Sequence, residues 1–178
     1  MKNFYSKNIK NQIKILNQID IKQLDQLQRI ILDVSKKGGK VIIVGNGGSA
    51  ATASHVAVDL SLNSKIKAIN FNESDLITCF ANDFGYENWV KKSLEIYSET
   101  KDLLILISCS GNSKNLVNAN IFAKKLGLKI VTLTGCKKNN KLNAIKNDLS
   151  FWVNSNEYNT IEIVHHCILL NIVDGLKK

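Results

Sequence analysis

The chain has 178 residues, a length that suits one domain and is enough to bury a hydrophobic core without disulfide bonds or a structural metal. Its 24 Lys and Arg residues outnumber its 15 Asp and Glu residues, and the net charge of +9 favours anionic partners. The basic residues are scattered, with no long run interleaved with aromatic residues, which argues against a nucleic-acid-binding protein.

No segment has the composition of a targeting or membrane-spanning sequence. Residues 1–16 lack the long apolar core of a signal peptide, and no apolar run reaches the ~20 residues that span a bilayer. The four cysteines lie far apart and form no CxxC pair, so a disulfide framework is not expected. We therefore expect a cytoplasmic protein with no membrane partner.

The N-terminal part of the chain is expected to be helical, because apolar residues recur there at steps of three and four. Two helices with a break near Ile19 and Asp20 fit this pattern as well as one. The apolar stripe is too extensive for the surface of a monomer, so we expect residues 1–36 to form a helical subunit interface. Residues 37–178 are expected to form an α/β core within the same single domain.

The rest of the chain alternates apolar strands with helices. Strands are expected at 40–44, 67–71, 103–108, 129–133 and 149–153. Helices are expected at 49–62, 75–81, 86–98, 114–126, 138–145 and 157–176. The alternation predicts an α/β fold, a three-layer sandwich in which helices flank both faces of a five-stranded parallel sheet. Ligands of such sheets bind beyond the carboxyl ends of the strands.

A glycine-rich turn, Gly45-Asn46-Gly47-Gly48-Ser49, follows the first expected strand and opens a helix. Its glycines let backbone N–H groups approach a ligand, and the helix N-terminus adds partial positive charge, so the turn is suited to an anion. Asn46 and Ser49 add side-chain donors. The spacing matches neither a P-loop nor the dinucleotide fingerprint, so no nucleotide cofactor is expected. A tight turn that needs glycine for its backbone alone is the alternative.

A second turn, Ser108-Cys109-Ser110-Gly111-Asn112-Ser113, again links an expected strand to an expected helix. Its three hydroxyls, its glycine and an N-cap position at Ser113 would make a second anion cradle. One serine-rich turn is most simply a helix cap. Two such turns in one small α/β chain indicate a ligand that carries a phosphate.

Three segments, in this order, resemble the motifs of the SIS-domain phosphoheptose isomerase family. GNGGSAATASHVAVDL (45–60) is similar to the first motif, and NESDLITCFANDFGYE (72–87) to the segment that follows it. ISCSGNSKNLVNA (107–119) is similar to the family's second phosphate loop. The resemblance runs over nearly the whole chain, and it is more specific for the fold than for the substrate.

The resemblance implies a SIS fold of the flavodoxin-like type and a homotetramer with active sites between subunits. It implies conversion of sedoheptulose 7-phosphate to D-glycero-D-manno-heptose 7-phosphate, for the heptose of lipopolysaccharide or capsule. It further implies that these residues hold the substrate: Asn46, Gly47, Gly48, Ser49, Ser108, Ser110 and Ser113. The family's Asn-Asp pair, here Asn82 and Asp83, would be directed at the sugar.

The chain has three histidines, all of them on two of the expected helices. His55 and Asp59 are four residues apart and share a helix face, for which surface ion pairing is the simplest explanation. On the closing helix, Glu162 shares a face with His166 and, nearly as well, with His165. If the two helices meet, two imidazoles and two carboxylates could bind zinc. These are His55, Asp59, Glu162 and His166.

The sequence departs twice from the zinc site that the resemblance implies. Family members carry His and Glu on the motif helix, and Gln and His eight residues apart on the closing helix. Here Asp59 replaces the Glu, and with Glu162 at the Gln position Leu170 stands where the His should be. Another register puts Cys167 there. The pattern resembles a divergent branch associated with surface-polysaccharide biosynthesis, in which we expect a rebuilt acid–base pair.

Aldose–ketose isomerisation moves a proton between adjacent carbons, so it needs a base near the carbon and an acid near the carbonyl oxygen. We expect Asp59 or Glu162 to be the base. His165 is the first candidate for proton donor, because histidine titrates near neutrality. A zinc ion at His55 would polarise the carbonyl.

Three other interpretations stay open. A non-catalytic SIS module that binds a phosphosugar or a replication initiator is favoured by the missing histidine, and an assay with sedoheptulose 7-phosphate would separate it from an enzyme. An isomerase of a hexose or pentose phosphate would be distinguished by product analysis. A nucleic-acid binder, suggested by charge alone, would show salt-dependent retention on DNA.

Overall fold

The structure, a computed structural model, describes residues 2–177. Five strands form one parallel sheet in the order β2-β1-β3-β4-β5, as predicted. They are β1 (Val41–Gly45), β2 (Ala68–Ile69), β3 (Leu103–Ser108), β4 (Lys129–Thr134) and β5 (Leu149–Trp152). Every residue of β1 and β3 is buried, as expected for central strands covered on both faces.

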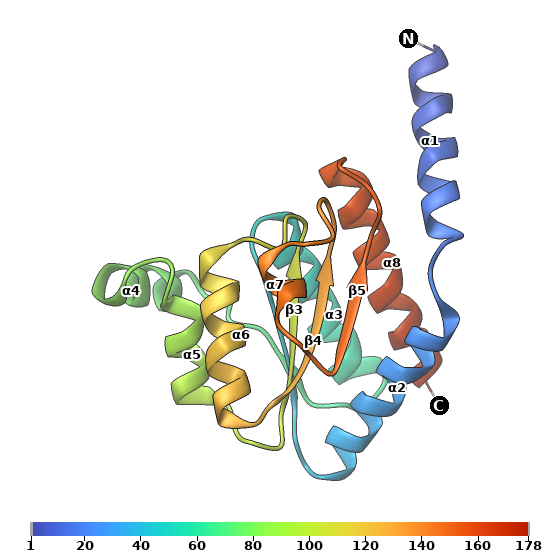
Figure 1. Ribbon diagram of the computed structural model, residues 1–178. Coiled ribbons are helices and arrows are strands. Elements are labelled where there is room, and N and C mark those ends of the chain that lie inside the picture. Colours follow the sequence, from blue (N-terminus) through green and yellow to red (C-terminus); the bar gives the residue numbers. More distant parts are fainter. Residues whose placement is uncertain (1, 178) are drawn as a thin grey trace.

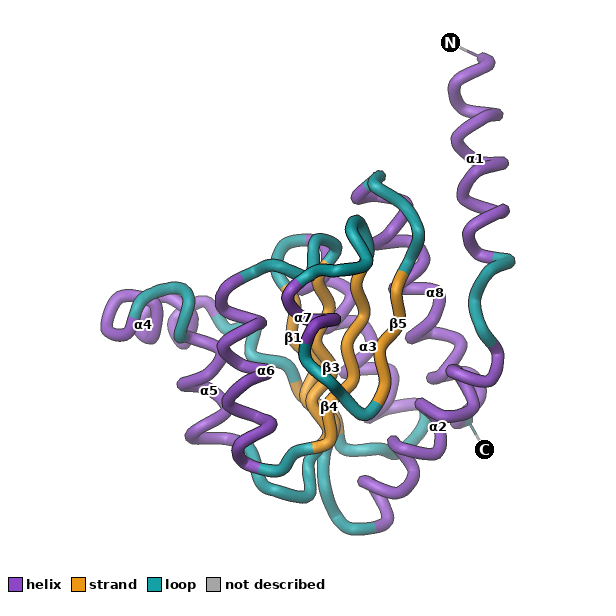
Figure 2. The backbone as a smooth tube through the Cα atoms, viewed as in Figure 1, coloured by secondary structure: helices purple, strands orange, loops and turns teal. Residues whose placement is uncertain are grey.

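Helices cover both faces of the sheet and complete the predicted three-layer sandwich (Figures 1 and 2). One face carries α2 (Ile21–Lys36), α3 (Gly48–Asn63) and α8 (Tyr158–Leu176). The other face carries α5 (Trp89–Tyr97), α6 (Lys114–Leu126) and the short α7 (Lys141–Ala144). The α4 helix (Ser74–Phe84) has no buried residue and stands off the body beside α5.

Successive strand residues point into two separate hydrophobic cores, because side chains alternate between the faces of a sheet. Val41 and Ile43 pack with α2, α3 and α8, whereas Ile42 and Val44 pack with α5 and α6. All four side chains are 0% exposed. In the observed register Gly45 ends β1 beside Ile107 of β3, which sets the place where the glycine-rich turn leaves the sheet.

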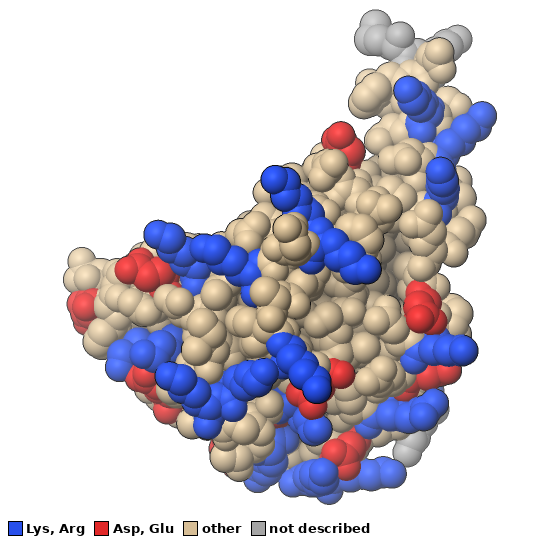
Figure 3. All heavy atoms as spheres, in the orientation of Figure 1, with Lys and Arg blue, Asp and Glu red and all other residues tan. Residues whose placement is uncertain are grey.

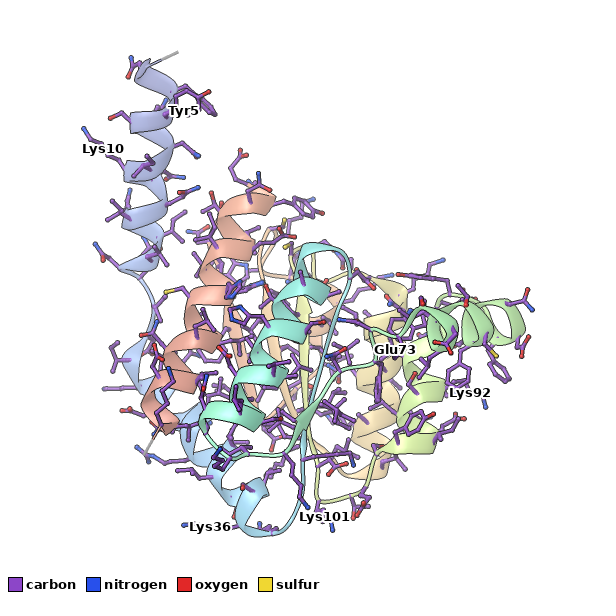
Figure 4. All side chains as sticks on the ribbon, turned by 180° about the vertical axis from the view of Figure 1, so that it is seen from behind. Tyr5, Lys10, Lys36, Glu73, Lys92 and Lys101 are labelled. Atoms are coloured by element: carbon purple, nitrogen blue, oxygen red, sulfur yellow. The ribbon has the colours of Figure 1, made fainter. Side chains whose placement is uncertain are left out.

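The helical N-terminal segment consists of two helices rather than one. Asp20 caps α2 by accepting a hydrogen bond from the Lys22 amide at 2.9 Å, and the chain turns just before it. The first helix, α1 (Lys2–Leu16), projects away from the body, and Figure 4 shows its Tyr5 and Lys10 clear of the sheet. Four apolar residues of α1 are exposed: Phe4, Tyr5, Ile9 and Ile13. They are available for a subunit interface, which stays a prediction.

Among the elements that are shorter than the sequence predicted, local side-chain bonds explain two. The expected strand 67–71 is reduced to β2 because Asn70 Oδ1 accepts a bond from the Asn72 amide at 2.8 Å and turns the chain. The expected helix 138–145 is reduced to α7 because Asn140 caps it, accepting a bond from the Asn143 amide.

The surface carries its charges in a mixed pattern. On the face in Figure 3, Lys and Arg side chains are spread over the molecule with Asp and Glu among them, rather than forming one basic band. Within residues 2–177, no helix is long and apolar enough to cross a membrane.

Candidate active site

The site lies where the strand order reverses. β1 is flanked by β2 and β3, and the chain moves outward from it in both directions, which makes the carboxyl ends of β1 and β3 a topological switch point. Gly45 at the end of β1 is paired in register with Ile107 near the end of β3. The two predicted turns therefore leave the sheet side by side.

A small cavity of about 140 Å³ lies between these turns. That is the liquid volume of about five waters, enough for a phosphoryl group. The side chains that line it come from both turns and from α8. They are Asn46, Ser49, Ile107, Ser108, Cys109, Ser110, Ser113, Tyr158 and Glu162. We call this the serine cavity. All the substrate-holding side chains predicted on the two turns are among its lining residues.

The second turn is shaped by its own hydroxyls. Ser108 Oγ accepts a bond from the Gly111 amide at 3.1 Å and lies 3.5 Å from Ser113 Oγ. Gly111 has φ +64°, and a side chain there would collide with the Asn140 amide group. Ser113 immediately precedes α6, so its hydroxyl and the first backbone amides of that helix lie together at the helix N-terminus, the end that favours an anion.

The first turn places the start of α3 against α8. Gly47 has φ +55°, and α3 begins at Gly48. A Cβ added at Gly48 would come within 2.6 Å of the Glu162 carboxyl carbon, so this position must be glycine for the carboxylate to lie there. The Glu162 side chain consequently lies over the N-terminus of α3, where the helix dipole favours a negative charge.

A second, larger cavity of about 850 Å³ opens beside the first, within the range of small-molecule sites. It lies between α3 and α8, which run side by side in Figure 4. We call it the imidazole cavity because His55 and His166 both line it. Glu162 lines both cavities, so its carboxylate stands in the wall between the serine turns and the two imidazoles.

Thr52, His166 and His55, which line the imidazole cavity, form a row of polar contacts that continues to Asp59 outside it. His55 Nε2 lies 3.3 Å from Asp59 Oδ2, and His55 Nδ1 lies 3.0 Å from His166 Nε2. Thr52 Oγ1 lies 3.4 Å from His166 Nδ1. Every group is satisfied if Thr52 donates to His166, His166 donates to His55, and His55 donates to Asp59. Burial, then the neighbouring His55, lowers the pKa of His166, and Asp59 opposes this shift.

A family model described as "SIS domain" matches residues 4–135 of the chain. The chain belongs to the SIS domain family. The phosphoheptose isomerase of Aliarcobacter butzleri (strain RM4018) is 34% identical over 148 residues, which are 80% of this chain and 77% of that protein. That of Glaesserella parasuis (strain SH0165) is 37% identical over 126 residues, or 68% and 66% of the two chains. The matched part thus spans just under two thirds of the Glaesserella protein. These matches confirm the resemblance to SIS-domain phosphoheptose isomerases.

Solved structures confirm the predicted fold. The phosphoheptose isomerase GmhA from Neisseria gonorrhoeae superposes with a TM-score of 0.91 at 24% identity, over 98% of this chain and 97% of that one. The Vibrio vulnificus NanR protein, solved with ManNAc-6P, gives a TM-score of 0.70 at 18% identity, over 98% and 63%. At these identities the likeness extends to the SIS fold alone.

His165, the predicted proton donor, is not at either cavity of this SIS domain. Neighbouring helix residues point about 100° apart, so His166 faces the cavity while His165 faces the sheet. His165 is 0% exposed, and its Nε2 donates to the Thr134 carbonyl at 3.2 Å. Burial lowers its pKa to about 4, and it is neutral at pH 7. The expectation that His165 donates the proton is therefore corrected.

Asn82 and Asp83 are not brought to either cavity within one chain. Both are exposed on α4, and Asn82 Nδ2 donates to Asp83 Oδ1 at 2.9 Å. The helix that carries them stands off the body of the SIS domain in Figure 1. Their predicted role toward the sugar stays a prediction that needs a contact beyond a single chain.

The four predicted zinc ligands do not fit a zinc ion. Asp59 faces Nε2 of His55, whereas His166 faces Nδ1 on the other side of the same ring, so one ion cannot take both. Glu162 is turned toward Gly48 and Cys109. Among residues 2–177, no three His, Cys, Asp or Glu side chains are grouped to hold a metal. We derive no catalytic step through zinc.

Sequence reasoning missed two residues that touch the predicted ligand-binding side chains. Asn115, in the first turn of α6, makes two hydrogen bonds with Asn46, at 2.9 and 3.1 Å. Tyr86 donates to Asn46 Oδ1 at 3.1 Å. No periodicity points to these bonds, because they join residues 69 and 40 positions apart that only the sheet topology brings together.

Proposed function

We propose that this chain is a phosphoheptose isomerase, which interconverts sedoheptulose 7-phosphate and D-glycero-D-manno-heptose 7-phosphate. One observation carries the proposal: the Glu162 carboxylate lies in the wall shared by the serine cavity and the imidazole cavity. A phosphate held on one side would present the other end of the sugar chain to the carboxylate. The relatives named phosphoheptose isomerase support the choice of substrate.

The serine cavity would hold the phosphoryl group. Its donors are the hydroxyls of Ser49, Ser108, Ser110 and Ser113 and the amides that open α3 and α6. Helix N-termini and hydroxyls bind phosphate without a metal or a nucleotide. This grip would orient the reacting carbons, and so convert binding energy into a favourable geometry for proton transfer.

Glu162 is the proposed base. Isomerisation requires one proton to leave the carbon that carries a hydroxyl and to be returned to the neighbouring carbon, through an enediol. A second proton passes from the hydroxyl to the carbonyl oxygen, so no net proton is consumed. A single carboxylate can carry the first proton in both directions.

His166 takes the place that His165 was expected to fill. It lines the imidazole cavity on the same face of α8 as Glu162, four residues away. Asp59, the other candidate base, is directed at His55, which makes it an orienting group. In the row from Asp59 to Thr52, His166 accepts at Nδ1 and donates from Nε2 to His55, so it would protonate the carbonyl oxygen by exchanging its bond to His55 for one to the substrate.

The test compares two carboxylates on one helix. Glu162→Gln keeps the shape of the side chain and removes the base, so kcat for sedoheptulose 7-phosphate should fall at least about 100-fold. The control, Glu157→Gln, changes an exposed carboxylate at the start of α8 and should keep full turnover. Asp59→Asn, which removes only an orienting group, should cost less than Glu162→Gln. Equal activity of Glu162→Gln and the parent would refute the assignment.

The second candidate is a non-catalytic phosphosugar-binding module. It is favoured by Leu170 and Cys167, which line the imidazole cavity where the resemblance expected a histidine. The likeness in fold to a NanR protein solved with ManNAc-6P is in keeping with it. This candidate predicts that sedoheptulose 7-phosphate raises the unfolding temperature of the protein without being turned over.

The assembly, the use of the product and the absence of zinc are further proposals. We propose a cytoplasmic homotetramer. The exposed apolar residues of α1 support a subunit interface, and sedimentation velocity would measure the mass of the assembly. A role of the product in lipopolysaccharide or capsule heptose follows from the proposed reaction. Zinc, which the donor geometry disfavours, would be excluded by turnover that survives dialysis against a chelator.

A further inference from the structure

The side-chain amide of Asn46 has almost all of its hydrogen-bonding capacity used inside the protein. Its Oδ1 accepts from Asn115 Nδ2 at 2.9 Å and from the Tyr86 hydroxyl at 3.1 Å. Its Nδ2 donates to Asn115 Oδ1 at 3.1 Å. An amide oxygen has two lone pairs and an amide nitrogen two hydrogens. What remains is a single N–H donor.

The remaining donor belongs to a ligand site, because Asn46 lines the serine cavity. With both lone pairs of Oδ1 engaged, Asn46 can donate to a ligand but cannot accept from one. The amide therefore suits an oxygen with no hydrogen of its own, such as a phosphoryl oxygen. If it were rotated by 180°, it would place lone pairs next to that oxygen and repel it.

The two residues that fix this orientation come from different parts of the fold. Asn115 is 2% exposed in the first turn of α6, two residues after Ser113, so its paired bonds tie the β1 turn to the β3 turn. Tyr86 lies in the link between α4 and α5, which Figure 1 shows at the edge of the body. Its ring lies 6.4 Å from the ring of Trp89, which is 1% exposed.

We propose that Tyr86 and Asn115 are positioning residues that hold Asn46 as an obligate donor to the substrate's phosphoryl group. The inference rests on the proposed function for the identity of the substrate, but not for the anion that the site binds. Through Tyr86, the α4–α5 link affects how tightly the serine cavity binds phosphate, although the link does not line that cavity. Asn115 makes the two turns act as one phosphate site.

Tyr86→Phe tests the proposal, since it keeps the ring beside Trp89 and removes only the hydroxyl. We expect KM for sedoheptulose 7-phosphate to rise about fivefold, the usual effect of one hydrogen bond, with kcat nearly unchanged. The matched control is Tyr97→Phe, on α5 with its ring 6.0 Å from that of Phe71, which should change neither constant. A loss of stability alone would move the unfolding temperature and leave KM in place.

A double-mutant cycle decides whether Tyr86 acts through Asn46. The dissociation constant of inorganic phosphate, measured by calorimetry, should rise about fivefold on Tyr86→Phe in the parent protein. It should not rise further when Tyr86→Phe is added to Asn46→Ala. An unchanged constant in the parent, or an undiminished effect in the Asn46→Ala background, would overturn the proposal. Because phosphate binding needs no turnover, the cycle gives its answer even if the isomerase assignment fails.

Discussion

At the scale of single residues, two adjacent histidines have opposite fates because a helix turns by about 100° per residue. His166 lies in the imidazole cavity, whereas His165 is sealed against the sheet. The sequence placed both on the correct helix but led us to rank His165 first as proton donor, since both lie close to the face that carries Glu162. Only the packing of α8 against the sheet decides which imidazole faces the cavity.

His165 should make the protein lose stability in mild acid. Its pKa is about 4 in the folded protein against an ordinary value of 6.5, because burial disfavours the charged imidazole. The unfolded chain therefore binds the extra proton first. The free energy of unfolding should be at its highest above pH 6.5, as far as His165 contributes to it. It should fall between pH 6.5 and about 4, by about 3 kcal/mol in total.

Urea unfolding measured across this pH range tests the role of His165. His165→Gln can still donate to the Thr134 carbonyl but does not titrate, so its curve should lack this part of the pH dependence. If the parent and His165→Gln lost stability in parallel from pH 6.5 to 4.5, the buried histidine would not be the cause.

At the scale of elements, the sequence predicted the strands and helices well, because burial on both faces and helical periodicity leave direct marks on composition. The ends of β2 and α7 were misjudged, since Asn70 and Asn140 set them through side-chain bonds that periodicity does not report. The serine turns were found because the strand, the glycine and the helix start are contiguous in sequence. The contacts of Asn46 with Asn115 and Tyr86 were missed because these residues are far apart in sequence.

At Gly48, at the start of α3, a substitution should lower activity without lowering stability. Gly48→Ala would improve helix propensity at the start of α3 but would push the Glu162 carboxylate aside. We expect kcat/KM to fall about 100-fold, as for a misplaced catalytic group, without a loss of stability in denaturant unfolding.

Gly175→Ala is the matched control, because a Cβ there would lie 3.6 Å from Gln28 Oε1, an ordinary van der Waals contact. It should stabilise α8 by about 0.5–1 kcal/mol and leave turnover unchanged. Full activity of Gly48→Ala would mean that the position of the Glu162 carboxylate against α3 does not matter for catalysis.

At the scale of the whole molecule, the sheet order explains why residues from three distant segments meet at one place. The order β2-β1-β3-β4-β5 puts the reversal point between β1 and β3, so both phosphate turns open on the same edge. α3 and α8 then meet over that edge and add Glu162 and the imidazoles. The projecting α1 carries exposed apolar residues, and α4 stands off the body, so we propose that both contact other copies of the chain.

The most direct test is a crystal structure of the Glu162→Gln variant with sedoheptulose 7-phosphate bound, since this variant should hold the substrate without converting it. We predict that the phosphoryl group lies within hydrogen-bond distance of Ser110, Ser113 and Asn46 Nδ2. The first two carbons of the sugar should lie beside residue 162. A phosphoryl group bound outside the serine cavity, or a sugar chain that leads away from residue 162, would contradict the account.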